Sequence, residues 1–189
     1  MPESSLTKKA LAQTFKELVC KESFEKVSVS DICAACQVSR KTFYYHFQDK
    51  YALMQWIFDT EYIAVWKRSR VTDRWAIVAS LCRYLYSERV FYEKLMEYRG
   101  QNSFRQYFQD FLFGILESFV LPEQEKIDAV AGRDGVPAAD AQAFFAHFIT
   151  DAVLFAIFRW LTDGAQQSPE EFVTLLKSTS DLMSTRLTE

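Results

Sequence analysis

The stretch of residues 27–50, VSVSDICAACQVSRKTFYYHFQDK, decides the fold. Ser28 and Asp31 have the spacing of a capping box. In this motif the serine side chain accepts a hydrogen bond from the backbone N–H of the acid, and the acid accepts one from the backbone N–H of the serine. Ser39 can cap a second short helix, which we expect to end at about Phe47. Two short helices joined by a turn of this length predict a helix-turn-helix.

The second of these helices has two unlike faces. Phe43 and Phe47 lie one helical turn apart and would anchor the helix to the core. The opposite face carries positive charge, hydroxyls and flat rings, from Arg40, Lys41, Tyr44, Tyr45 and His46. Cations and hydroxyls suit phosphate contacts, and base edges can be read by Arg and Lys donors or by rings packed on thymine methyls. We therefore interpret this face as a DNA-recognition surface rather than as aromatic core.

These residues resemble the signature of the tetracycline-repressor (TetR) family of bacterial regulators, V-S-x-x-T-h-Y-x-H/Y-F-x-x-K, where h is apolar. The sequence Val-Ser-Arg-Lys-Thr-Phe-Tyr-Tyr-His-Phe, with a lysine three residues on, matches it at residues 38–50. The resemblance covers about residues 8–58, where the preceding amphipathic helix and the capping box also have the family's spacing. Residues 24–58 more loosely resemble the branch that regulates dihydroxyacetone-kinase operons.

The resemblance implies a role for each matching position. Arg40 and Lys41 stand where base-reading residues begin the recognition helix, and Tyr45 and His46 stand where further base or backbone contacts arise. Lys50 stands where the family has a phosphate clamp. The other implied contacts are hydroxyls that would face the DNA backbone: Ser28, Ser30, Ser39, Thr42 and Tyr44.

Two positions depart from the family's pattern. Ser23 and Gln37 stand where the family usually has glycine. Gln37 lies in the turn between the two short helices, where a positive φ costs a residue with a side chain more than it costs glycine.

Helical periodicity continues along the rest of the chain. We expect a first helix at about 7–20, a long, rigid fourth helix from about Asp49 toward Arg68, and a loop at 121–137. Further helices are predicted at about 73–86, 89–98, 103–120, 138–162 and 169–186. The expected fold is all-α. A three-helix DNA-binding domain, residues 1–50, is joined by the long helix to a helical bundle, residues 51–189, for effector binding and dimerisation.

The composition sets limits on function. A formal net charge of −3 leaves DNA binding open, because only the contacting face must be positive. Cys33 and Cys36 form a CxxC pair, but the two further ligands of a zinc site do not follow. We expect both to be small core residues, with redox sensing as the alternative. No cofactor, metal or catalytic constellation is predicted, and the absence of a signal-peptide pattern favours the cytoplasm.

Aromatic and polar residues of the larger domain suggest an effector site. His147 and Asp151 lie one turn apart on an apolar helix, where they could form an interhelical hydrogen bond or a polar contact within a pocket. Core packing and the lining of a cavity are equally good interpretations of the aromatic residues. The candidate pocket comprises Phe58, Tyr62, Trp66, Arg83, Arg99, Tyr107, Phe108, Phe111, His147 and Asp151.

The last two predicted helices carry apolar side chains that would stay exposed in a monomer. Pairing across a two-fold axis would hide them in a four-helix interface. The candidate interface residues are Val153, Ile157, Trp160, Leu161, Phe172, Leu175, Leu176, Leu182 and Met183.

The sequence thus predicts a regulator that binds a palindromic DNA operator as a homodimer, under the control of a small-molecule effector or a partner protein. The alternative is a helical enzyme or adaptor that keeps a vestigial helix-turn-helix. The fourth helix would touch both the DNA and the pocket, which offers a route for coupling. The operator, the effector and the sign of regulation stay open.

Overall fold

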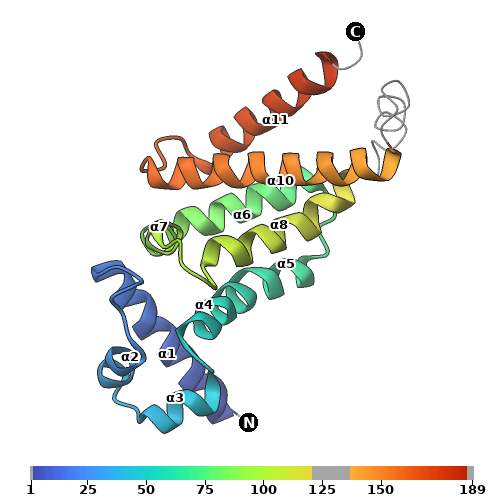
Figure 1. The fold of residues 1–189 in the computed structure, drawn as a ribbon. Helices are drawn as coiled ribbons and strands as arrows, with labels where there is room; N and C mark the ends of the chain where they lie inside the picture. Colours follow the sequence, from blue (N-terminus) through green and yellow to red (C-terminus); the bar gives the residue numbers. More distant parts are fainter. Residues whose placement is uncertain (1, 121–136, 187–189) are drawn as a thin grey trace. The chain divides into compact units, whose positions relative to one another are not determined.

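The structure, a computed structural model, describes residues 2–120 and 137–186, and within these ranges it is helical and contains no strand (Figure 1). The chain forms two compact units, Met1–Arg105 and Gln106–Glu189. The elements are α1 (Pro2–Lys21), α2 (Val29–Cys36), α3 (Arg40–His46), α4 (Lys50–Phe58), the π-helix η1 (Asp59–Ile63), α5 (Ala64–Ser69), α6 (Arg74–Ser87), α7 (Arg89–Glu97), α8 (Phe104–Val120), α10 (Ala138–Thr162) and α11 (Pro169–Arg186).

The helix-turn-helix is fixed by local hydrogen bonds that its sequence predicts. Ser28 caps α2, and its main-chain N–H donates to the Asp31 carboxylate over 2.9 Å, which completes the capping box. Ser39 caps α3 by accepting a 3.0 Å hydrogen bond from the Thr42 N–H. Gln37 ends α2 in the left-handed region, with φ 57° and ψ 37°. The turn therefore adopts the positive φ that glycine usually supplies, at the expense of some backbone strain.

The three N-terminal helices enclose a common core. Leu11, Phe15 and Val19 form the buried stripe of α1. Ile32 from α2 and Phe43 from α3 are fully buried in the same unit, and α1 packs against both helices. The apolar residues that recur at helical spacing therefore bury one face of each helix, as their periodicity predicts.

The expected fourth helix has the predicted extent, but its α-helical pattern is interrupted. The segment is helical from Lys50 to Ser69, but η1 interrupts the α-helical pattern between α4 and α5. The N–H of Ala64 donates to the carbonyl of Asp59, five residues back, which is the hydrogen bond of a π-turn. The segment is therefore not one regular rod between its two ends.

Aromatic side chains fill the core around α6 and α7. Phe58 is fully buried and lies 5.5 Å from Phe104, ring centre to ring centre. Tyr62 stacks on Tyr84 at 5.4 Å, and its hydroxyl donates to the carbonyl of Ile77 over 3.1 Å. Phe58 and Tyr62, two residues of the expected pocket, therefore pack as core.

In the second unit α10 packs against both α8 and α11 (Figure 1). Phe108 of α8 stacks with Phe158 of α10 at 6.3 Å. Trp160 of α10 stacks with Phe172 of α11 at 4.6 Å, with the rings within 7° of parallel. Helix α10 is also long and apolar enough to cross a membrane, but only by length and composition, which is weak evidence for a membrane span.

Candidate nucleic-acid interface

The second helix of the motif, α3, separates its core and solvent faces as its periodicity predicts. Phe43 and Phe47 are 0% and 5% exposed, so they hold the helix on the core. Tyr44 and Tyr45 are 50% and 81% exposed. A tyrosine that keeps four-fifths of its surface in water gains little from burial, which leaves its ring available to a partner.

Arg40 and Tyr44 contact each other on the exposed face of α3. The Arg40 guanidinium donates a 3.4 Å hydrogen bond to the Tyr44 hydroxyl and lies 5.9 Å from the ring centre. This hydrogen bond raises the pKa of Arg40, whose guanidinium is a cation at any physiological pH. Lys41 is exposed beside it, and Tyr45 meets His46 edge to face at 4.9 Å. The face offers two cations and two aromatic rings to a ligand.

Several predicted phosphate-contacting hydroxyls already serve the helix caps. The Ser28 hydroxyl donates to the Asp31 carboxylate over 2.6 Å and lowers the pKa of that acid. The Ser39 and Thr42 hydroxyl oxygens lie 2.8 Å apart. Ser30, by contrast, is exposed on α2. The caps set the direction of both helices, and each hydroxyl keeps acceptor capacity for a second partner.

Lys50 is placed differently from the expected phosphate clamp. Its ammonium donates to the carbonyl oxygens of Phe24, Glu25 and Val27 over 2.8, 3.2 and 2.8 Å. An ammonium has three hydrogens, so all of them are in use. Burial lowers the pKa of Lys50, in part offset by the nearby carboxylates. In this conformation Lys50 fastens the loop between α1 and α2 to the start of α4.

The residues predicted to line one effector pocket are divided between the two units. Phe58 and Tyr62 belong to the aromatic core of the first unit, where Trp66 is half-buried and Arg83 and Arg99 are exposed. The others lie in the second unit, where Phe108 is fully buried, His147 is exposed, and Tyr107, Phe111 and Asp151 are half-buried. Asp151 accepts a 2.7 Å hydrogen bond from Gln109 of α8, which confirms the interhelical interpretation for this residue.

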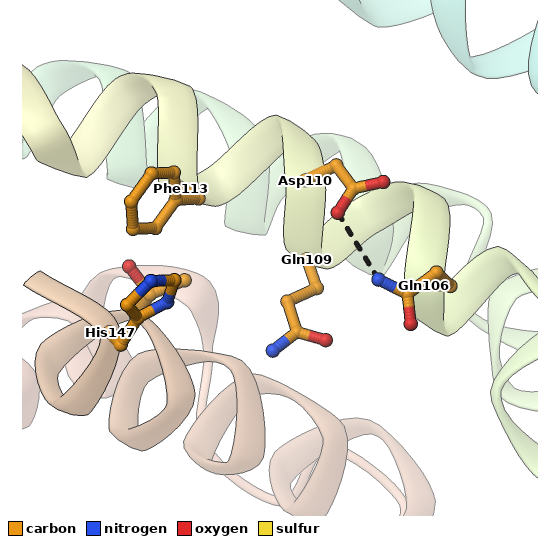
Figure 2. A pocket seen from close by; sticks show the side chains of 6 residues that line it. Gln106, Gln109, Asp110, Phe113 and His147 are labelled. Carbon is orange, nitrogen blue, oxygen red and sulfur yellow. Dashed lines mark hydrogen bonds between the residues drawn. The ribbon is translucent and has the colours of Figure 1, made fainter.

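A groove of about 270 Å³ does lie between α8 and α10 (Figure 2). His147 stacks on Phe113 at 4.5 Å at one end, and Gln106 donates to Asp110 over 3.2 Å. Its lining residues are Gln106, Gln109, Asp110, Phe113, His147 and Thr150. Small-molecule pockets usually hold about 300–1,000 Å³ and enclose most of the ligand. The volume of the groove lies slightly below that range, and exposed residues rim it.

The exposed apolar surface of the second unit differs from the predicted one. Ile157, Trp160, Leu161 and Phe172 are already buried within a single chain, so they need no partner. Val153 and Leu176 are half-buried, and the Met183 side chain lies outside the described residues. Leu175 and Leu182 are exposed as predicted. The sequence prediction omitted three exposed rings of α10: Phe144, Phe148 and Phe155.

Lys16 is the other residue that the sequence interpretation omitted. It lies on α1 four residues after Ala12 and three before Val19, both buried, and it is itself only 8% exposed. Its ammonium lies 2.8 Å from Glu88 and 3.1 Å from Glu61. A lysine at core spacing on an apolar stripe was the signal that could have revealed it, because such a charge needs a partner.

Comparison with protein families covers most of the chain. Residues 16–56 match the model for bacterial regulatory proteins of the tetR family, and residues 73–181 match the model for a transcriptional regulator C-terminal region. The chain belongs to the TetR family of transcriptional regulators. The resemblance drawn from the 27–50 stretch is thereby confirmed.

Individual TetR-family proteins are similar over much of the chain. The HTH-type dhaKLM operon transcriptional activator DhaS of Lactococcus lactis is 28% identical over 129 residues, which are 68% of each protein. A solved structure of the dihydroxyacetone kinase operon activator DhaS is 20% identical, covers 96% of both chains and has a TM-score of 0.58.

Two further solved structures share the fold. A TetR transcriptional regulator from Streptococcus agalactiae is 18% identical over 92% of this chain and 93% of its own, with a TM-score of 0.64. NalD, the secondary repressor of the MexAB-OprM multidrug efflux pump in Pseudomonas aeruginosa, is 18% identical over 94% of both chains, with a TM-score of 0.57.

Proposed function

We propose that this TetR-family transcriptional regulator binds a palindromic DNA operator as a homodimer and reads base edges with the exposed face of α3. The observation that carries the proposal is the division of α3 into a buried Phe43 and Phe47 face and an exposed face with Arg40, Lys41 and Tyr45. A short helix held from behind by two aromatic residues and presenting cations outward has the geometry for entering a major groove.

The exposed residues divide between sequence reading and phosphate contact. Arg40 and Lys41 at the start of α3 are placed to donate to guanine acceptors. The Tyr44 hydroxyl, held by Arg40, is suited to a phosphate oxygen, and the Tyr45 ring can pack on thymine methyls. Ser30, exposed on α2, would meet the neighbouring DNA backbone.

A second copy of the chain would cover the exposed apolar face of α10 and α11. Isolated exposed apolar residues are ordinary, whereas contiguous apolar patches mark interaction sites, and here exposed phenylalanines recur along α10 and exposed leucines along α11. Pairing of this face with itself gives the two-fold symmetry that a palindromic operator requires. The face comprises Phe144, Phe148, Phe155, Leu175 and Leu182.

Control of DNA binding is assigned to a small-molecule effector or a partner protein in the cytoplasm. For a small molecule, the groove of Figure 2 is the best-supported site among the described residues, and its amide, carboxylate and imidazole groups favour a polar ligand. DhaS is named as an activator and NalD as a repressor, so the family supports either sign. The position of the operator relative to its promoter would decide which applies.

Selection of DNA sites by the purified chain tests the proposal. The wild-type chain and an Arg40→Ala/Lys41→Ala variant are each incubated with a random duplex library, and the bound fraction is sequenced over successive rounds. The wild type is expected to enrich an inverted repeat, and the variant is expected to enrich none. Enrichment of the same repeat by both proteins would show that α3 does not read the bases.

A further inference from the structure

Lys16 of α1 forms ion pairs with two glutamates that follow the helix-turn-helix in the sequence. The side chain is 10% exposed, and its ammonium lies 3.1 Å from Glu61 Oε2 and 2.8 Å from Glu88 Oε1. Glu61 belongs to the π-turn η1, and Glu88 is the residue from which α7 starts. One ammonium therefore joins α1, the irregular turn after α4, and the beginning of α7.

The contacts of α7 with the DNA-binding helices continue along its length. In the first turn of the helix, Phe91 meets Phe15 of α1 edge to face at 5.9 Å. Past its last residue, the Tyr98 hydroxyl lies 3.0 Å from that of Tyr51 on α4, and the Tyr98 ring lies 5.0 Å from Phe24. Therefore α7 contacts the DNA-binding helices at its start and just past its end.

The charged end of this contact is geometrically demanding. Glu61 accepts a second hydrogen bond, 3.0 Å from the Tyr84 hydroxyl, and that hydroxyl lies 2.6 Å from the Tyr92 hydroxyl. Burial disfavours the Lys16 charge, but the hydrogen bonds and charges of Glu88 and Glu61 outweigh it and raise the pKa of Lys16. Apolar surfaces can slide on each other, whereas a buried cation with two carboxylate partners fixes one arrangement.

We propose that Lys16, Glu61 and Glu88 form a charged joint that sets the orientation of the DNA-reading helices on α7, and that control acts on DNA binding by opening this joint. The proposal rests on the proposed function, since it specifies how the same DNA-binding site is regulated. In it Lys16 is a positioning residue, which acts through α1 and does not touch DNA.

The route differs from coupling through a rigid fourth helix. The π-turn η1 interrupts that helix, and Glu61 lies within the turn. Because π-turns are irregular and often mark functional positions, η1 is a suitable place for a change of arrangement. In the closed joint, the two recognition helices of a dimer are held at one separation. Displacement of α7 or η1 by an effector would open the joint, because it would move a carboxylate away from Lys16 and release α1.

The test compares DNA binding by Lys16→Met with that of the wild type. Two probes are used: the duplex that the wild-type chain selects from a random library, and a scrambled duplex of equal length. Lys16→Met is expected to weaken binding to the selected duplex by about 5- to 50-fold. Binding to the scrambled duplex and its salt dependence should not change, because a buried residue makes no phosphate contact. Lys16→Arg, which keeps the charge, should restore most of the affinity.

Two further variants separate orientation from a general loss of structure. In a Glu61→Gln/Glu88→Gln background, Lys16→Met should cause no further loss of affinity for the selected duplex, because the joint is already open. Lys94→Met removes a half-buried lysine of α7 that lies 4.0 Å from Glu97, and it should bind both duplexes like the wild type. Circular dichroism checks that each variant is folded. If Lys16→Met does not fold, Glu88→Gln takes its place and is judged by the same criteria.

The outcomes are distinct. The proposed joint would be overturned if folded Lys16→Met bound the selected duplex with an affinity within about twofold of that of the wild type. Equal losses of affinity for both duplexes would overturn it as well. If the wild type selects no sequence at all, the proposed function itself fails, and the joint falls with it for that separate reason.

Discussion

The Lys50 ammonium donates a 2.8 Å hydrogen bond to the main-chain carbonyl of Phe24 and lies 4.5 Å from the centre of the Phe24 ring. The same ammonium also binds two neighbouring carbonyls of the loop between α1 and α2. The lysine at the end of the TetR-family signature thus supports the helix-turn-helix from within this chain.

This geometry predicts that Lys50→Met destabilises the protein. Hydrogen bonds from a charged donor are worth about 1.5–3 kcal/mol, and the loss would leave partly buried carbonyls without that donor. We expect the free energy of unfolding in urea to fall by about 1–3 kcal/mol. The salt dependence of DNA binding should stay unchanged. An unchanged stability together with a salt slope lower by about one would instead identify Lys50 as a phosphate contact.

Arg40→Ala is expected to weaken specific binding by about 1–3 kcal/mol and to relax sequence preference at the base pair that it contacts. The reason is that a bidentate donor to a base edge is lost while the fold keeps its core. Gel-shift titrations with single-base variants of the selected duplex measure both effects. Tyr44→Phe, which removes only the hydroxyl partner of Arg40, serves as a milder control and should weaken all duplexes about equally.

Substitutions on the exposed face of α10 should break the dimer. A Phe148→Glu/Phe155→Glu variant places two carboxylates in the proposed apolar interface, where their desolvation is costly. Sedimentation equilibrium at micromolar concentration is expected to show a dimer for the wild type and a monomer for the variant. Leu6→Glu changes an apolar residue of α1 that is 65% exposed, and it should stay dimeric. A dimeric double variant would place the interface elsewhere.

Stability should fall at alkaline pH because of buried tyrosines. Burial raises the pKa of Tyr62 to about 12, above its ordinary value of 10.0. A group whose pKa is raised by folding contributes stability that is complete below its unfolded pKa and is lost as pH rises through the folded one. We therefore expect the free energy of unfolding to decline between about pH 10 and pH 12. The decline should be shallower in Tyr62→Phe, and equal slopes in the two proteins would contradict this assignment.

Local signals explain why much of the fold was predictable. The Ser28 and Asp31 spacing, the Ser39 cap and the two inward phenylalanines of α3 depend on neighbours a few residues away. The left-handed turn at Gln37 could be expected from its place in the motif, because the two helices can meet only if the chain turns sharply there. These features needed no knowledge of distant contacts.

Other features depend on contacts that a single sequence does not show. The apolar residues around η1 have a spacing that also fits an ordinary α-helix. The sequence therefore gives no sign of the extra residue in the π-turn. Helix α10 is apolar on nearly every side, and periodicity could not separate buried Ile157 from exposed Phe155. Lys50 matches the family signature whichever partner its ammonium takes. The carboxylate partners of Lys16 lie 45 and 72 residues away along the chain.

Hydroxyl-radical footprinting of the wild-type chain on its selected duplex tests the central claim most directly. If two copies insert α3 into successive major grooves, two protected patches should appear on one face of the DNA. Their centres should lie about 34–36 Å apart or a multiple of that distance, related by the two-fold axis of the repeat. A single patch, or the same diffuse protection on a scrambled duplex, would contradict sequence-specific binding by a dimer.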